Sequence, residues 1–206
     1  CGGAFPYITV ESFQPCAATL AMQMGCFVAG VMLSGPIRLL LEEPVYVAFD
    51  APREDMADLA VAVLQPDGPI DEAWALALAE AAHVPPQALR LVAVPMNSVA
   101  GCTQIAGRMN ENVVLTLVRS LGYPAARVRH ILGTSPVCPV YKGPGPMLLP
   151  DDFLHYLGEA VLALDAAPED DLSALAHTLC FESLPIFGAL FGELLAAAGG
   201  DFFKIP

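Results

Sequence analysis

Short apolar runs bounded by Pro, Gly or Asp recur along the chain and predict buried strands. They cover residues 5–10, 45–49, 59–64, 89–94 and 158–164. Strict alternation of apolar and polar positions supports the first of them, and the closing residues 202–205 have the composition of a further strand.

Helical spacing of apolar positions fills most of the intervals between these runs. It predicts helices over residues 15–25, 71–82, 99–121, 170–179 and 185–198. The longest has Val113, Val114, Leu117 and Leu121 on one face and Gly122 just beyond its end. The stretch 133–150 is rich in Pro and Gly yet too apolar for a disordered linker, so an ordered loop is predicted there. Alternating strands and helices indicate an α/β to α+β layered fold.

One segment is long enough to test as a membrane span, because residues 16–33 contain no charge. It is built of Ala, Gly, Thr and Gln rather than Leu and Ile, and no Lys or Arg precedes it to set an orientation. A buried helix followed by a buried strand is the prediction.

The charge balance excludes two classes of partner. Asp and Glu number 22 against 9 Lys and Arg, which gives a net charge of −13. Such a field repels nucleic acid and anionic membrane surfaces. Four of the cations lie in one stretch of the chain: Arg108, Arg119, Arg127 and Arg129. Two interpretations are open, a local anion site or solvated arginines on a helix and the turn that follows it.

The sequence contains six cysteines without C-x-x-C spacing and four histidines isolated from one another. This pattern predicts reduced, mostly buried thiols and no metal site. A redox or thiol function rests on the cysteine count alone. The first residue is not Met and no charged leader with a cleavage site is present, so a cytoplasmic protein lacking its first residues is expected.

Common catalytic motifs such as G-x-x-x-x-G-K, G-x-S-x-G and H-E-x-x-H are absent from the sequence. A polar, small-residue string over residues 94–104 instead joins a predicted strand to the long helix, a junction that ligands often approach. Asn97, Ser98, Gly101 and Gln104 are its candidate ligand contacts, although Ser98 alone is better explained as a helix cap.

Arg108 and Glu111 follow on the same helix, three residues apart and therefore on one face. An R-x-x-E pair on a helix is usually a surface ion pair of little energetic value. Here Gly107, Met109 and Val113 surround the pair with small or apolar residues, which argues against an ordinary solvated ion pair.

These blocks resemble methenyltetrahydromethanopterin cyclohydrolases, whose members carry A-P-T-x-S-x-x-G-S-x-Q followed by A-R-V-x-E. Residues 94–104 and 107–111 match that pattern. Further blocks are similar over nearly the whole chain: residues 34–38 to S-G-P-x-R, 133–140 to G-x-A-P-x-x-P-x, 151–159 to N-D-x-x-x-Y-G-G-E, and 201–205 to D-F-Y-K-I.

The resemblance implies two α/β subdomains, residues 1–94 and 95–206, with a reduced pterin bound in a cleft between them, and a homo-oligomer. It implies hydrolysis of a methenyl group to a formyl group on tetrahydromethanopterin, with Glu111 as base, Arg108 beside it, and Ser135 and Asp152 as further substrate contacts. No metal or other cofactor is then required, because the pterin carrier is the substrate.

Two departures from the family pattern keep an alternative open. Residues 182–187 replace the D-Y-G-x-P-F of family members, and those members extend further at both ends. A noncatalytic or altered-specificity pterin-binding homologue, or an assembly subunit, is the rival prediction.

Overall fold

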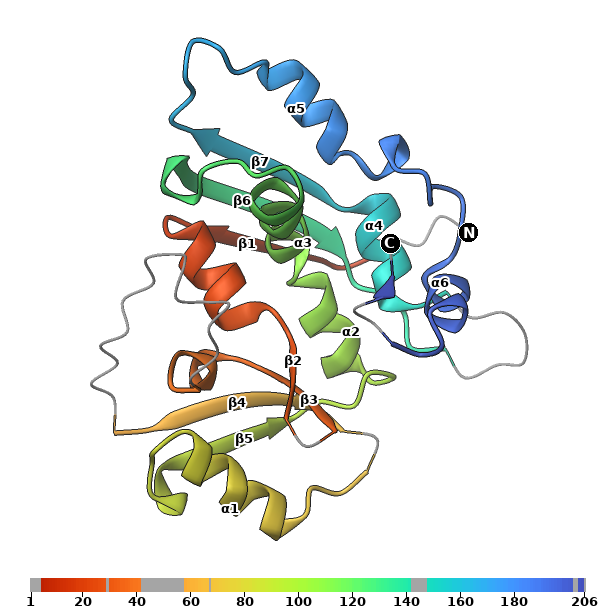
Figure 1. Cartoon of the computed structure of the whole chain (residues 1–206). Helices are drawn as coiled ribbons and strands as arrows, with labels where there is room; N and C mark the ends of the chain where they lie inside the picture. Colours follow the sequence, from red (N-terminus) through yellow and green to blue (C-terminus); the bar gives the residue numbers. More distant parts are fainter. Residues whose placement is uncertain are drawn as a thin grey trace.

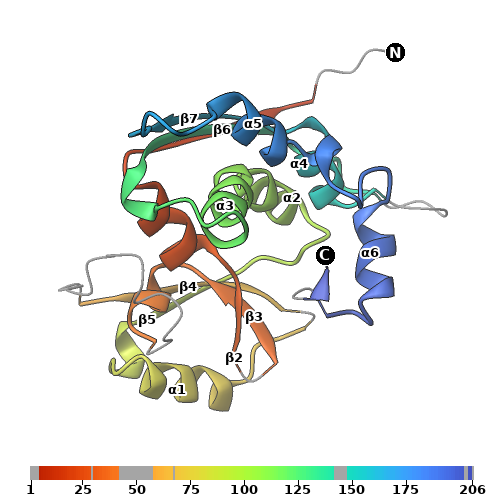
Figure 2. The ribbon, with the colours of Figure 1, turned by 45° about the horizontal axis from the view of Figure 1, so that its top comes forward.

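Two β-sheets with a helical layer between them form the frame of the molecule (Figure 1). The computed structural model describes residues 5–28, 30–41, 58–66, 68–141, 148–201 and 204–205. Figure 2 shows the layers from a second direction, with α2 and α3 between the sheets and α1 on the outer side of one of them. The predicted layered α/β to α+β class is confirmed.

The first sheet has the order β1-β6-β7, with antiparallel neighbours. Its strands are β1 (Tyr7–Ser12), β6 (Val128–Pro136) and β7 (Glu159–Leu164). β1 comes from the start of the chain and pairs along β6, so the first predicted subdomain contributes a strand to the sheet of the second. The boundary at residue 94 stays a prediction with that qualification.

The second sheet has the order β2-β3-β4-β5. A hairpin of β2 (Cys26–Val28) and β3 (Val31–Ser34) pairs with β4 (Ala60–Gln65), and β4 runs parallel to β5 (Leu89–Ala93). The helix α1 (Glu72–Ala81) connects these parallel strands, and the Asp71 side chain caps it by accepting a hydrogen bond from the Ala73 amide. This is the predicted strand–helix–strand unit.

The layer between the sheets contains the π-helix η1 (Ala17–Gln23), α2 (Val99–Ala106), α3 (Met109–Leu115) and a π-helical turn over Thr116–Ser120. A core cluster fixes this layer on the first sheet and includes the fully buried Leu20, Val114, Leu117 and Ile131. The uncharged segment near the N-terminus is therefore a packed helix followed by a hairpin. Within the described residues, no helix is long and apolar enough to cross a membrane.

The single helix predicted over residues 99–121 is wrong at its centre. α2 ends at Ala106, Gly107 is its C-cap, and Arg108 leaves helical geometry with φ −95° and ψ 8° before α3 begins. Glycine lowers the cost of breaking a helix, and tertiary hydrogen bonds of Arg108 hold the break open.

The remaining helices lie toward the C-terminus. They are α4 (Pro150–Leu157), α5 (Leu172–Leu179) and α6 (Phe191–Ala197). The helix predicted over residues 185–198 is therefore wrong in its first half, because residues 185–190 form turns and irregular structure before α6 begins. The loop predicted over 133–150 is wrong at both ends, because β6 continues to Pro136 and α4 begins at Pro150.

Two predicted strands fall on residues that are not fully described. Residues 45–49 lie outside the described ranges, as do 202 and 203. The amide of Lys204 bonds to the Asp201 carbonyl as in a turn, so the strand predicted over 202–205 is not continued there.

Candidate active site

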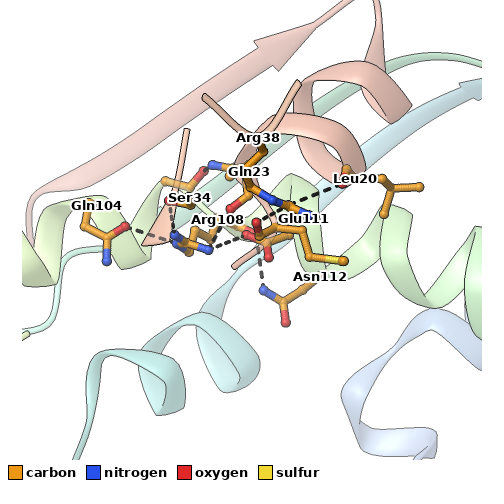
Figure 3. A network of polar contacts seen from close by, with 10 residues as sticks. Leu20, Gln23, Ser34, Arg38, Gln104, Arg108, Glu111 and Asn112 are labelled. Atoms are coloured by element: carbon orange, nitrogen blue, oxygen red, sulfur yellow. Dashed lines mark hydrogen bonds and ion pairs between the residues drawn. The ribbon is translucent and has the colours of Figure 1, made fainter. Parts of the chain in front are cut away.

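The break between α2 and α3 places Arg108 at the centre of a polar network (Figure 3). Its Nη1 lies 2.8 Å from Oε2 of Glu111 in the first turn of α3, and the two side chains are only 14% and 10% exposed. The predicted pair is therefore present, and it lies between the two sheets rather than on the exterior.

Every nitrogen of the Arg108 guanidinium has a partner. Nε donates to Oε1 of Gln104 at 3.1 Å, and Nη2 donates to Oγ of Ser34 at 3.0 Å. Nη1 also donates to the Gln23 carbonyl at 3.0 Å, in addition to its bond to Glu111. Contacts among the described residues thus use four of the five guanidinium N–H groups and leave one on Nη2 that can bind a ligand.

Gln23 forms hydrogen bonds with both residues at the helix break, Gly107 and Arg108. Its Nε2 donates to the Gly107 carbonyl at 2.9 Å, while its own carbonyl accepts from Arg108. Gln23 is the last residue of η1, and π-helical turns are frequent at functional sites because they displace backbone groups from the regular ladder.

The segment 34–38 contributes a second guanidinium. Gly35 has φ 105°, and a Cβ there would lie 3.1 Å from the Val61 carbonyl oxygen, so glycine is needed for the turn from β3 into the 3₁₀ helix η2 (Pro36–Leu39). Arg38 follows, is 2% exposed, and donates to the carbonyls of Leu20 and Met24. Ser34 and Arg38 are site residues that spacing did not reveal. The resemblance of their block was the available signal.

Burial decides the acidity of Glu111. Desolvation raises its pKa from 4.5 to about 6, against the opposing charges of Arg108 and Arg38, and the charge of Asp151 on α4 adds to the rise. Among the described residues, the Glu111 carboxylate takes a hydrogen bond at Oε2, from Arg108, and none at Oε1. The site therefore presents a carboxylate oxygen that can accept a proton near neutral pH.

The other predicted contacts divide into two groups. Gln104 joins the network, and its Nε2 has no hydrogen-bond partner within the described ranges, so it can donate to a ligand. Ser98 caps α2, since its Oγ accepts from the Gly101 amide at 3.0 Å and donates to the Pro95 carbonyl at 2.6 Å. Gly101 is required by packing, because a Cβ there would lie 2.2 Å from that carbonyl oxygen.

The side chains of Asp152 and Ser135 contact backbone groups of the fold. Both carboxylate oxygens of Asp152 accept backbone amides, from Leu149 at 2.7 Å and Phe191 at 2.6 Å, which ties α4 to α6. Ser135 is fully buried in β6, with its Oγ 3.5 Å from the Pro136 carbonyl oxygen. Neither is brought to Arg108 or Glu111 by a contact among the described residues, so their predicted substrate contacts gain no support.

Asn97 is exposed and lines a small hollow beside the start of α2. The hollow encloses about 50 Å³ and is also lined by Cys102, Cys138, Leu148 and Pro150. This is space for one or two water molecules, so a pterin cleft between the subdomains stays a prediction.

Cys102 and Cys138, which show no paired spacing in sequence, are hydrogen-bonded neighbours in this hollow. Burial raises both thiol pKa values, that of Cys138 to about 11. Protonated thiols are poor nucleophiles, which weakens the thiol interpretation. Among the described residues, no three His, Cys, Asp or Glu side chains lie together so that they could hold a metal ion.

The described residues thus place a buried carboxylate–guanidinium pair, with one carboxylate oxygen free of a hydrogen bond, inside a layered α/β fold. Such an arrangement is able to take part in acid–base chemistry. The chain belongs to the cyclohydrolase (MCH) family, whose model matches residues 2–206.

Curated relatives carry the name methenyltetrahydromethanopterin cyclohydrolase. The protein of Methanococcus aeolicus is 29% identical over 97% of this chain and 64% of its own length. That of Methanocaldococcus jannaschii is 28% identical over 99% and 65%. That of Methanothermobacter marburgensis is 26% identical over 98% and 65%. The chain thus spans just under two thirds of the length of these relatives.

Proposed function

We propose that the protein hydrolyses methenyltetrahydromethanopterin to formyltetrahydromethanopterin. The observation that carries the proposal is the buried Arg108–Glu111 pair, held at 2.8 Å in a family whose curated relatives bear the name of this activity. The substrate's methenyl carbon bridges two nitrogens as an amidinium cation, which is open to attack by water.

Glu111 is the general base in this proposal. Its Oε1 accepts a proton from water as the oxygen bonds to the methenyl carbon, a role that typically contributes about 10² to 10⁴ in rate. With a pKa of about 6, Glu111 is mostly ionised at neutral pH and yet basic enough to take the proton.

Arg108 positions the attacking oxygen. Its remaining Nη2 N–H can donate a charge-assisted hydrogen bond to the water and to the carbinolamine oxygen that forms. Collapse of that carbinolamine breaks one carbon–nitrogen bond and leaves the formyl group on the other nitrogen. The free Nε2 donor of Gln104 and the exposed side chain of Asn97 are the proposed pterin contacts. As part of the same proposal, the chain acts in the cytoplasm as a homo-oligomer and needs no metal or further cofactor.

A spectroscopic assay of the purified chain with methenyltetrahydromethanopterin tests the proposal. The Glu111→Gln variant is expected to lose about 10² to 10⁴ in kcat while it still binds the substrate, because the amide keeps the shape but cannot accept the proton. Glu11→Gln is the matched control, since Glu11 is an exposed carboxylate on β1 that bonds His130. Full activity of Glu111→Gln would contradict the mechanism. Binding without turnover by the folded wild type would favour the noncatalytic alternative.

A further inference from the structure

Gln23 contacts the helix break with two groups of opposite character. Its side-chain Nε2 donates to the Gly107 carbonyl at 2.9 Å, and its backbone carbonyl accepts from Nη1 of Arg108 at 3.0 Å (Figure 3). Within the described ranges, Gln104 and Ser34 bind only the guanidinium of Arg108. Gln23 is therefore the residue from outside the break that binds both its backbone and the arginine head group.

The side-chain contact replaces a bond that a continuous helix would make. In an α-helix the carbonyl of residue 107 accepts from the amide of residue 111, four residues further on. Arg108, with φ −95° and ψ 8°, interrupts that ladder, and the Gln23 amide is the donor that the structure shows for the Gly107 carbonyl. A carbonyl left without a donor inside the fold is costly, so this bond favours the broken helix over the continuous one.

The backbone contact depends on where η1 ends. Gln23 is the last residue of η1, and the last carbonyls of a helix have no donor within it. The Gln23 carbonyl accepts from Arg108, and the carbonyls of Leu20 and Met24 accept from Arg38. The end of η1 thus supplies acceptors to both guanidiniums of the site.

The position of the guanidinium relative to Glu111 depends on the break. Arg108 lies in the break itself, so its backbone angles set the direction of its side chain. Glu111 lies in the first turn of α3, which is regular helix. A change at the break therefore moves the guanidinium against a fixed carboxylate. A displacement of about 1 Å near reacting groups can cost about 10² in rate.

We infer that Gln23 is a positioning residue of the proposed hydrolysis, an inference that rests on the proposed function. Its side-chain amide holds the end of η1 at the break, and this keeps its carbonyl within reach of Nη1 of Arg108. Gln23 needs no contact with the substrate in this role. It fixes the guanidinium beside Glu111, and the pair performs the chemistry.

The charge of Arg108 makes the position of its guanidinium measurable. Three charged groups act on Glu111: Arg108 and Arg38 lower its pKa, and Asp151 raises it, while burial has the largest effect. Of these groups, Arg108 is the one that the structure shows in hydrogen-bond contact with Glu111. Movement of the guanidinium away from Glu111 is expected to raise the Glu111 pKa above about 6, because a stabilising positive charge recedes.

Gln23→Met tests the inference, because Met keeps the length of the side chain and removes the amide donor. The variant is expected to lose about tenfold in kcat/KM at pH 7. The midpoint of the acid limb of its kcat/KM profile is expected to move up by as much as about one pH unit, since the base must be ionised to act. Gln23→Asn, a smaller change that shortens the donor arm, is the second variant and is expected to shift the profile in the same direction.

Thr19→Ala is the matched control. Thr19 lies on the same helix, is 1% exposed, and donates through Oγ1 to the Pro15 carbonyl at 2.7 Å. The substitution weakens η1 without removing a contact to Arg108. It is expected to lower Tm and to leave the acid limb in place. If Thr19→Ala moved the profile as far as Gln23→Met does, the role of Gln23 would be merely structural.

A carbon-13 titration of the Glu111 carboxyl measures the same contact without substrate. The Glu111 pKa is expected to rise in Gln23→Met and to stay unchanged in Thr19→Ala. An active wild type together with a folded Gln23→Met variant of unchanged kcat/KM, or an unchanged Glu111 titration in that variant, would overturn the positioning role alone. An inactive, folded wild type would overturn the proposed function itself.

Discussion

Two arginine–carboxylate pairs in this protein have the same chemistry and opposite surroundings. Arg108 and Glu111 lie between the sheets with side chains 14% and 10% exposed, whereas Arg129 and Asp165 lie at the end of the first sheet with side chains 65% and 56% exposed. Both arginines belong to the cation-rich stretch, for which the sequence left two interpretations open, an anion site or solvated arginines. In the structure Arg108 is buried and Arg129 is solvated, so each interpretation fits one of them.

Desolvation makes the difference between the two pairs. Burial raises the pKa of Glu111 to about 6 although two guanidiniums oppose the rise. The exposed pair is surrounded by water, which screens the attraction and solvates each charge. The comparison teaches that an arginine–carboxylate pair gains a carboxylate of raised pKa only where packing removes water from it.

Among changes to the arginines of the two pairs, the largest expected effect comes from replacing Arg108 by lysine. Arg108→Lys is expected to lower kcat by about 10² or more, because a lysine amine cannot hold Gln104, Ser34 and Glu111 at once. Arg129→Lys is expected to leave kcat unchanged. Steady-state kinetics of the two variants measure the contrast, and equal rates would remove the distinction between the pairs.

The second prediction concerns stability and pH. The folded-state pKa of Glu111, about 6, exceeds the ordinary glutamate value of 4.5, so the folded protein binds the proton more tightly and loses stability as pH rises through this window. The loss above pH 7 is about 2 kcal/mol. Glu111→Gln is expected to be more stable than wild type by up to that amount at pH 8, and to converge with it toward pH 4. Urea unfolding at the two pH values provides the measurement, and a variant less stable at pH 8 would contradict it.

A smaller effect is expected from one hydrogen bond to the guanidinium. Ser34→Ala removes the 3.0 Å partner of Nη2, which is worth about 1 kcal/mol, so kcat should fall less than about tenfold. Ser12→Ala, which removes a hydroxyl that caps the exposed Gln14 amide, is the matched control. A loss equal to that of Arg108→Lys would mean that Ser34 contacts the reacting groups itself.

The smallest effect is expected at the exposed pair. Arg129→Gln should change the free energy of unfolding by less than about 1 kcal/mol, and the change should shrink further in 1 M salt. Thermal unfolding at low and high salt measures it. A larger, salt-independent change would show that this pair is not governed by solvent.

Local interactions explain which predictions from sequence were confirmed. The helix predicted to start at residue 71 begins there, and the cap predicted at Ser98 is present; the capping bonds at both starts join residues two or three apart, so the nearby chain suffices to form them. The parallel β4–α1–β5 unit follows from runs of apolar residues in one stretch of chain. The family blocks added the segment 34–38, although nothing in its spacing indicated which of its residues reach Arg108.

Longer-range packing explains what was missed. The helix break at Gly107 was not visible in the apolar periodicity of residues 99–121, because it depends on Gln23 bonding the Gly107 carbonyl from η1. Asp152 matched a family block, yet it is Asp151 whose charge reaches the pair, since one residue along α4 turns a side chain by about 100°.

The amino-acid sequence by itself determined the layered class, the cap at Ser98, and the closeness of Arg108 and Glu111, because each depends on residues near one another along the chain. Only the tertiary structure decided that the pair is buried and which groups hold it. The Ser34 hydroxyl and the Gln23 carbonyl bond Arg108 from 74 and 85 residues away. Such contacts exist only after the two sheets have enclosed the helical layer and excluded the water that would otherwise solvate the guanidinium.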